Sequence, residues 1–235
     1  MTADMSAGAQ ITDADVRRCG YGTAAASRLL WQVYATSGLS VRALAALRPL
    51  IARLDRLIAV IPNRSHVLEI GCGTGLLLFL LHKYGLLRES VGLDIDATSI
   101  ADAQRAALAR KLPIEFRRST TLRDWPADQF DVVLMVDVLH HVPRALRRQM
   151  IEAALTRVAA GGLFIYKDMC RRPVLRRLWN QLHDLMLARQ LVSVEPIEHV
   201  LGWATAAGFV SITSERYVGA GLYGHELEVL CRQTG

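Results

Sequence analysis

The stretch VLEIGCGTG, from Val67 to Gly75, leads from an apolar run into three glycines that alternate with other residues. The apolar run predicts a strand. The glycines predict a loop whose backbone turns tightly and approaches a ligand closely, because glycine has no Cβ. A dinucleotide-binding loop needs its third glycine three residues after the second, but position 76 is Leu and the last glycine is Gly75. The spacing therefore weakens the case for NAD.

Strand and helix patterns alternate around and after this loop. Strands are predicted over His66–Ile70, Ser90–Asp94, Pro113–Arg117, Phe130–Val136 and Gly162–Lys167, and helices over 76–84, 98–110, 144–159, 174–191 and 197–207. Two last strands, near Phe209–Tyr217 and His225–Arg232, have only residues 218–224 between them, which is too short for a crossover helix. The pattern predicts an α/β fold with a parallel sheet, helices on both faces, and a closing hairpin that adds one antiparallel strand.

The residues before the first strand show a helical pattern up to about Ile61. Apolar side chains recur there at helical spacing, namely Leu29, Leu30, Val33, Tyr34, Leu44, Leu47, Leu50, Ile51, Leu54, Leu57 and Ile58. We therefore expect an N-terminal helical cap or lid over residues 1–61 and a core over residues 62–235, with a helical insertion near 171–192.

Length and composition indicate one sizeable domain with a buried core. The chain has 235 residues, 51% of them hydrophobic, and its longest apolar run, Leu76–Leu81, is far below the roughly 20 residues that span a bilayer. The N-terminal segment has an acid and no basic residue before an apolar stretch, unlike a secretory signal. The four cysteines are scattered without a CxxC pair, which fits a reducing compartment. We expect a cytoplasmic protein without a membrane span.

The net charge of +6 comes largely from clustered arginines. The clusters are Arg144, Arg147 and Arg148, then Arg171, Arg172, Arg176 and Arg177. Such a basic surface suits nucleic acid, an acidic protein partner or an anionic substrate. It equally describes a solvated helix face, because charge alone fixes no partner.

Two acids indicate which ligand the glycine loop favours. Asp94 ends the next strand about 20 residues after the loop, where a carboxylate accepts hydrogen bonds from both hydroxyls of a ribose. Glu69 stands two residues before the first glycine, where it repels a pyrophosphate but not an ammonium group. Together they favour a nucleoside that carries an amino acid and no phosphate.

Four motifs in order carry a resemblance to a known family, namely VLEIGCGTG, VGLDID, FDVVLMVDVLHHVP and AAGGLFIYKD. Over about Val67 to Arg232, the chain resembles class I S-adenosylmethionine-dependent methyltransferases of the small-molecule type. The resemblance implies a Rossmann-like seven-stranded sheet of order 3-2-1-4-5-7-6 with strand 7 antiparallel, in agreement with the hairpin. It also implies S-adenosyl-L-methionine as cofactor and S-adenosyl-L-homocysteine as product.

The resemblance further implies a role for each residue of a cofactor site. The glycine loop passes under the methionine part of the cofactor, Glu69 lies near its amino group, and Asp94 holds the ribose. Ile95 packs on the adenine, and Ser119 takes the place of an acid that often meets the adenine amino group. The implied site consists of Glu69, Gly71, Cys72, Gly73, Gly75, Asp94, Ile95, Ser119, Thr120, Val136 and Asp137. The alternatives are that Glu69 caps the loop, Asp94 caps a helix, and Cys72 is a small filler.

Methyl transfer from a sulfonium is an in-line displacement, so the protein has to align the acceptor and remove its proton. Histidine, aspartate, glutamate and tyrosine suit the role of base. The catalytic candidates are Asp168, His183 and His141, and the substrate-binding candidates are Tyr21, Tyr34, His140, Trp179, Tyr223 and His225. The alternatives are structural: the HH pair shapes a helix start, Asp168 pairs with an arginine, and His183 borders an apolar helix stripe.

The residues favour a small-molecule acceptor and no metal. Asp137 and Asp168 have suitable places for a metal, but no adjacent carboxylate or amide pair completes a ligand set. Base-modifying enzymes of this type often carry Asn-Pro-Pro-aromatic after the fourth strand, whereas this chain has VDVLHHVP, so nucleic acid is not the expected partner. We expect O-methylation of an aromatic or polyketide-like metabolite in natural product biosynthesis, free or held on an acidic carrier protein.

Three other functions stay open. The basic face suits an RNA or protein methyltransferase. A cofactor-binding subunit without catalysis would carry the same cofactor motifs. A nicotinamide reductase is the most distant alternative.

Overall fold

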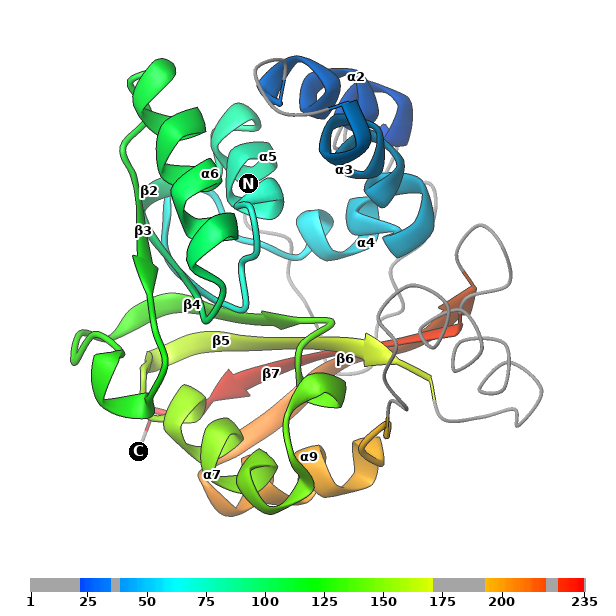
Figure 1. The fold of residues 1–235 in the computed structure, drawn as a ribbon. Helices are drawn as coiled ribbons and strands as arrows, with labels where there is room; N and C mark the ends of the chain where they lie inside the picture. The colour runs from blue at the N-terminus through cyan, green and yellow to red at the C-terminus, as the bar shows by residue number, and fades with distance from the viewer. Residues whose placement is uncertain (1–21, 35–38, 171–192, 219–223, 235) are drawn as a thin grey trace.

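The computed structural model describes residues 22–34, 39–170, 193–218 and 224–234 (Figure 1). The strands are β1 Ser65–Ile70, β2 Leu87–Asp94, β3 Ile114–Arg118, β4 Phe130–Val136, β5 Val158–Met169, β6 Phe209–Val218 and β7 Gly224–Arg232. The helices are α2 Thr23–Val33, α3 Leu39–Ala52, α4 Leu54–Ala59, α5 Leu76–Lys83, α6 Ala97–Ala109, α7 Arg144–Leu155 and α9 Ile197–Ala206. Two short 3-10 helices, η1 Leu122–Asp124 and η2 Leu139–His141, follow β3 and β4.

The sheet confirms the predicted order, which is β3-β2-β1-β4-β5-β7-β6. The pairs β1–β2, β1–β4, β2–β3 and β4–β5 are parallel, whereas β7 runs antiparallel between β5 and β6. The predicted closing hairpin is therefore confirmed as well. Because the parallel strands all point the same way, their carboxyl ends share one edge, which is where open α/β sheets bind ligands.

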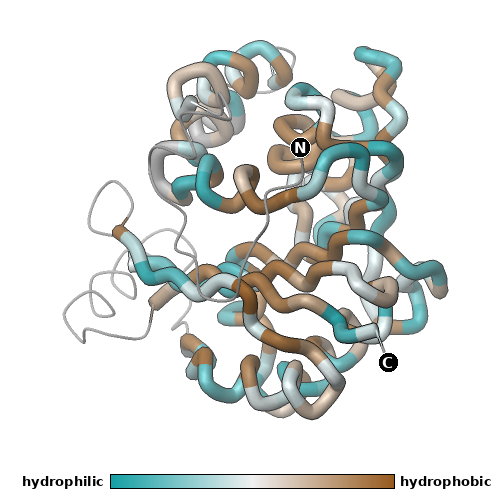
Figure 2. The backbone as a smooth tube through the Cα atoms, turned by 180° about the vertical axis from the view of Figure 1, so that it is seen from behind, coloured by the Kyte–Doolittle hydropathy of each residue, from teal (hydrophilic) through white to brown (hydrophobic). Residues whose placement is uncertain are grey.

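Alternating side chains of the strands divide the core into two clusters, one on each face of the sheet. Val132 and Leu134 of β4 pack with the N-terminal helices, α5 and α6, whereas Val133 and Met135 pack with α7 and α9. Figure 1 shows these two helical layers above and below the sheet. In Figure 2 the strands between them form a hydrophobic band, as expected for strands that are buried on both faces.

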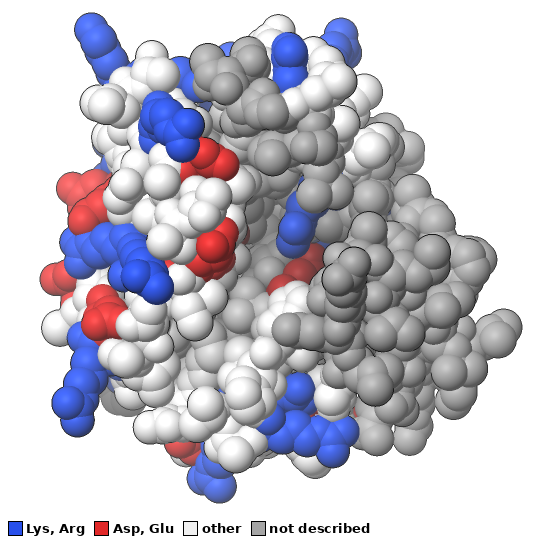
Figure 3. Space-filling model, viewed as in Figure 1, with Lys and Arg blue, Asp and Glu red and all other residues white. Residues whose placement is uncertain are grey.

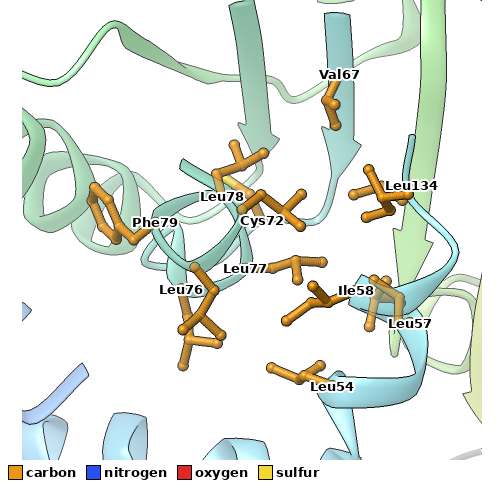
Figure 4. Close-up of a cluster of buried hydrophobic side chains, with 14 of the residues drawn as sticks. Leu54, Leu57, Ile58, Val67, Cys72, Leu76, Leu77, Leu78, Phe79 and Leu134 are labelled. Atoms are coloured by element: carbon orange, nitrogen blue, oxygen red, sulfur yellow. The ribbon is translucent and has the colours of Figure 1, made fainter. Parts of the chain in front are cut away.

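The N-terminal helices share a core with the sheet. Leu54, Leu57 and Ile58 of α4 are buried, and Figure 4 shows Leu54 and Ile58 on the side of Leu76 and Leu77 of α5. One hydrophobic cluster continues from α2 through α4 into the strands. The division into a cap over residues 1–61 and a core over residues 62–235 stays a prediction.

The predicted helix over 144–159 is too long. α7 ends at Leu155, and β5 begins at Val158, which is fully buried and pairs with Phe130. The amide of Phe130 also donates to the carbonyl of Arg157 at 2.7 Å. Because apolar spacing alone does not separate the end of a helix from the start of a buried strand, the pattern did not indicate this boundary.

The predicted helix over 174–191 and the insertion near 171–192 lie outside the described residues. In the parts of the chain that the structure describes, no helix is both long and apolar enough to cross a membrane.

Gly92 of β2 allows a close approach between strands. A Cβ there would lie 2.7 Å from Cδ1 of Phe116 and 2.9 Å from Sγ of Cys72. We therefore expect Gly92→Ala to lower the free energy of unfolding by about 1–3 kcal/mol in urea denaturation, because overpacking strains a dense core. Adding Phe116→Leu should recover part of the loss. Gly202→Ala in α9 is the control, since nothing lies within 4 Å of its Cβ position. Equal stability of Gly92→Ala and the wild type would contradict the prediction.

Candidate active site

A cavity of about 830 Å³ opens at the carboxyl ends of β1, β2 and β4. Residues on its wall that the sequence predicted for the site are Gly71, Asp94, Ile95, Ser119, Thr120, Asp137 and His141. Apolar side chains on the same wall include Trp125, Val142, Leu146 and Met150. Figure 3 shows acidic and basic side chains around a hollow in one face of the molecule.

Two glycines of the loop are required by its shape. Gly71 has φ +76°, and a Cβ there would lie 2.3 Å from Cγ2 of Val138. Gly75, which precedes the first residue of α5, has φ +83°, and its Cβ would lie 2.4 Å from Cζ of Phe116. Both backbone conformations are left-handed, which side chains disfavour. The loop therefore turns sharply in a space that fits only glycine at these two positions.

Asp94 clamps the glycine loop to the end of β2. Its Oδ2 accepts a hydrogen bond from the amide of Gly73 at 2.7 Å, and its Oδ1 accepts one from the amide of Asp96 at 2.9 Å. The amides of Gly71 and Cys72 both donate to the carbonyl of Leu93, at 2.7 and 2.9 Å. The loop is thus held to β2 before any ligand binds.

Tyr34, a predicted substrate contact, supports the loop from behind. Its side chain is 1% exposed, and its hydroxyl donates to the carbonyl of Thr74 at 2.8 Å. Its ring meets the edge of Phe79. Tyr34 therefore links the N-terminal helices to the glycine loop through a hydrogen bond. Its contact with a substrate stays a prediction.

Glu69 is buried in β1 with one unpaired oxygen. No described residue forms a hydrogen bond with its Oε2. Burial raises the pKa of Glu69 to about 8, while Arg48 opposes this shift and Asp94 adds to it. The buried carboxyl group therefore keeps its proton to a higher pH than an exposed glutamate does. A cationic group entering the site would favour its ionised form, which fits the predicted position near an amino group.

Asp137, directly after β4, has a backbone φ of 57°, which is rare for residues other than glycine. Its amide donates to the carbonyl of Lys167 at 2.8 Å, and Lys167 Nζ donates to its two carboxylate oxygens at 2.8 and 3.0 Å. Arg48 of α3 lies 3.8 Å from the same carboxylate. Burial acts to raise the pKa of Asp137, but Lys167, His225 and Arg48 outweigh it and hold that pKa well below its usual range.

The sequence did not reveal the parts that Lys167 and Arg48 play. Lys167 is 0% exposed, and its Nζ also contacts Nδ1 of His225 at 3.2 Å. The available signal was a lysine inside an apolar strand, FIYKD, because a buried ammonium group needs partners. Arg48 gave no signal, since only the folding of α3 over the sheet brings it to Asp137.

Asp168 and His140 form a second polar cluster on the opposite face of the sheet. Nδ1 of His140 contacts Oδ1 of Asp168, and the hydroxyl of Tyr166 donates to Oδ2 at 3.2 Å. All three side chains are buried. The ring of His141, which lies on the cavity wall, packs on the ring of His140 with 4.0 Å between centroids.

The remaining predicted residues are less informative. Cys72 and Val136 are buried, and burial raises the pKa of the Cys72 thiol, so the contacts of both residues with the cofactor stay predictions. Tyr21, Trp179, His183 and Tyr223 lie outside the described residues. Among the described residues, no three His, Cys, Asp or Glu side chains gather as metal ligands, and the absence of a metal stays a prediction.

A family model described as a methyltransferase domain matches residues 42–214. The matched range holds the glycine loop, Asp94 and the carboxyl ends of β4 and β5. The chain belongs to the class I S-adenosylmethionine-dependent methyltransferase family.

The chain is similar to curated relatives over part of its length. It is 40% identical over 76 residues to a ubiquinone biosynthesis O-methyltransferase of Rhodopseudomonas palustris (strain HaA2), which covers 32% of this chain and 29% of that protein. It is 31% identical over 109 residues to the protein of the same name from Pseudomonas fluorescens (strain SBW25), covering 46% and 45%. The chain thus spans less than half the length of the curated relatives it matches.

Solved structures share the fold of this chain. Magnesium protoporphyrin IX methyltransferase from Synechocystis PCC 6803, with bound SAH, is 16% identical with a TM-score of 0.60, covering 96% of this chain and 90% of that one. The PH0226 protein from Pyrococcus horikoshii OT3 is 24% identical with a TM-score of 0.61, covering 84% and 93%. At these identities the likeness shows the fold alone.

Replacing Glu69 should remove a pH-dependent loss of stability. The pKa of Glu69 is about 8 in the folded protein against 4.5 for an exposed glutamate, so the folded state keeps a proton that the unfolded chain loses. The stability that the wild type owes to this proton is fully present below about pH 4.5, and it is lost as the pH rises to about 8. Glu69→Gln cannot ionise, so it should gain stability relative to the wild type across this range in urea unfolding. Glu89→Gln, at an exposed position of β2, is the control. A difference that does not vary with pH would contradict the prediction.

Proposed function

We propose that this protein transfers the methyl group of S-adenosylmethionine to a hydroxyl group of a small-molecule acceptor, in particular an aromatic or polyketide-like metabolite. The observation that carries the proposal is the cavity on which the glycine loop, Asp94 and the end of β4 converge. The partial matches to O-methyltransferases support the same chemistry.

The end of β2 supports an adenosine group. Each oxygen of Asp94 already accepts one backbone amide, and a carboxylate has about four acceptor positions, so two remain for ribose hydroxyls. Ile95 is 67% exposed beside the cavity and offers an apolar surface for adenine. Ser119 and Thr120 on the same wall add polar groups near the place proposed for the adenine edge.

The charges at the ends of β1 and β4 support an amino acid group. Glu69 gains a partner for its unpaired oxygen if an ammonium group binds there. Arg48 is half exposed and acts on both Glu69 and Asp137, so its guanidinium is available to pair with a ligand carboxylate. The bound cofactor supplies an electrophilic methyl group on its sulfonium. The protein then has to orient the acceptor and accept its proton.

Contacts of the arginines on α7 favour a small acceptor over RNA. Arg147 is 2% exposed and donates to Glu195 at 2.8 Å and to the carbonyl of Ser193 at 2.6 Å. Arg148 pairs with Glu152 within the same helix. Since Arg147 serves an internal ion pair, it adds little to a binding surface. Arg171, Arg172, Arg176 and Arg177 lie outside the described residues. An acidic carrier protein and a cytoplasmic location stay predictions.

Calorimetric titration with S-adenosylmethionine, S-adenosylhomocysteine and NADH tests the cofactor. Asp94→Asn should weaken binding of both adenosyl compounds by about 10- to 100-fold, because it removes charge-assisted hydrogen bonds to ribose and loosens the loop. Asp102→Asn, which removes one partner of an ion pair on the surface of α6, should keep wild-type affinity. NADH should bind to neither of these variants. Unchanged affinity of Asp94→Asn for the adenosyl compounds would contradict the proposed contact between Asp94 and the ribose.

Methyl transfer from labelled S-adenosylmethionine to phenols, catechols, carboxylic acids and RNA tests the reaction. Labelled phenols or catechols would support the proposal. Labelled RNA, with affinity that falls steeply with salt, would favour the nucleic-acid alternative. Cofactor binding without transfer to any class would favour a subunit without catalysis.

A further inference from the structure

The N-terminal helices belong to a segment that is positively charged and has no acidic residue. Residues 16–54 contain six arginines and no aspartate or glutamate, although the whole chain has 22 acidic residues among 235. Arg48 and Arg53 of this segment are paired with carboxylates outside it. Arg28 and Arg42 donate to backbone carbonyl groups instead, so that, within the described residues, no carboxylate compensates their charge.

Exposed apolar side chains lie on the same two helices, α2 and α3. Trp31 of α2 is 39% exposed, and Leu39 and Leu47 of α3 are 71% and 52% exposed. They are three of the seven large hydrophobic side chains that are exposed among the described residues. A helix that only covers a protein core turns mainly polar residues to solvent, so three large apolar groups on two neighbouring helices indicate a surface that contacts something else.

The charged and apolar side chains form one continuous surface. Leu39 and Leu47 are two turns apart on the solvent side of α3. The guanidinium of Arg42, one turn after Leu39, lies over the ring of Trp31 with 4.1 Å to its centroid, and Arg28 lies one turn before Trp31 on α2. Figure 1 shows α2 and α3 packed against each other at the top of the view, on the outside of the molecule. Arginine, tryptophan and leucine are therefore presented side by side.

The end of α6 extends this surface. Nη2 of Arg110 donates to the carbonyl of Gln32 at 2.7 Å, which places its guanidinium beside α2. Lys111 follows directly and is exposed. Leu108, in the last turn of α6, is 79% exposed. The end of a third helix thus brings basic and apolar groups next to the same region.

This combination of side chains fits an anionic lipid surface. Arginine pairs with phosphate through two parallel hydrogen bonds, tryptophan prefers the boundary between water and hydrocarbon, and leucine enters the apolar layer. RNA offers phosphates to the arginines but no apolar layer to the leucines. An acidic protein needs a pocket matched to each leucine, whereas a fluid lipid layer accommodates side chains that project from the outer sides of two helices.

We propose that α2 and α3 attach this protein to the surface of an anionic membrane. The side chains that make the contact are Arg28, Trp31, Leu39, Arg42 and Leu47. α2 has 11 residues and α3 has 14, fewer than the about 20 that span a bilayer, so the helices lie among the lipid headgroups and insert only side chains. This attachment is independent of the methyl-transfer function.

Flotation of the full chain with lipid vesicles tests the proposal. The protein should bind vesicles of equal parts phosphatidylglycerol and phosphatidylcholine at least about 10-fold more tightly than vesicles of phosphatidylcholine alone, and added salt should weaken the binding. Leu39→Ser combined with Leu47→Ser should weaken binding to the anionic vesicles by at least about 10-fold, because the inserted apolar groups are lost. Arg28→Gln should weaken it by about 5-fold. Equal binding to both kinds of vesicle, or to neither, would overturn the proposal.

Matched substitutions elsewhere show whether the loss is specific to this surface. Val210→Ser removes an apolar side chain that is 41% exposed on β6, and Arg148→Gln removes an exposed arginine of α7. Both variants should bind the anionic vesicles as the wild type does. An equal loss in these controls would contradict the proposal, since binding would then follow total charge and hydrophobicity.

Tryptophan fluorescence locates the contact on the protein. Lipids with brominated acyl chains should quench the fluorescence of the bound wild type, and Trp31→Phe should remove most of this quenching while keeping an aromatic ring beneath Arg42. Trp203→Phe, in α9, is the control and should keep the quenching. Quenching that survives in Trp31→Phe would overturn the assignment to α2 and α3. Binding to polyglutamate without binding to vesicles would also overturn the proposal and would indicate an acidic protein partner.

Discussion

The hydrogen bond from the Gly73 amide to the Asp94 carboxylate is the contact on which the site depends. It joins the glycine loop after β1 to the tip of β2, and two more amides of the loop donate to the carbonyl of Leu93. Gly71 and Gly75 supply the left-handed backbone that makes these bonds possible. A loop fixed in this way has little conformational entropy left to lose when a ligand binds.

The sequence predicted those parts of the structure that follow from local pattern. The alternating strands and helices, the closing hairpin, the glycine loop and Asp94 were accessible, because apolar periodicity and motif spacing depend on neighbouring residues, whereas the strand order was implied by the resemblance to a known family. The boundary between α7 and β5 was not, since Val158 pairs with a strand 28 positions earlier in the chain. The contact between His140 and Asp168 was hidden for the same reason. Each was a candidate alone, and only the sheet brings them together.

Successive residues of β5 serve opposite faces of the sheet. Lys167 points to the side of the N-terminal helices and holds Asp137, while Asp168 points to the side of α7 and α9 and holds His140. A shift of one residue in the pairing of β5 would exchange a buried cation with a buried anion. Both ionic contacts would then be lost, and an unpaired buried charge is costly. The two clusters therefore specify the register of β5 between β4 and β7.

The hydrogen bond from Tyr34 to Thr74 joins two residues that are 40 positions apart in the chain, and it thereby couples two processes. One is the docking of α2 on the core, and the other is the ordering of the loop that faces the cavity. Thermodynamic linkage makes such a coupling reciprocal. If docking of α2 raises the affinity for a ligand by some factor, ligand binding raises the docking constant of α2 by the same factor. A substitution at the α2 interface would therefore alter affinity without touching the ligand, and ligand affinity would report how firmly the N-terminal helices are attached.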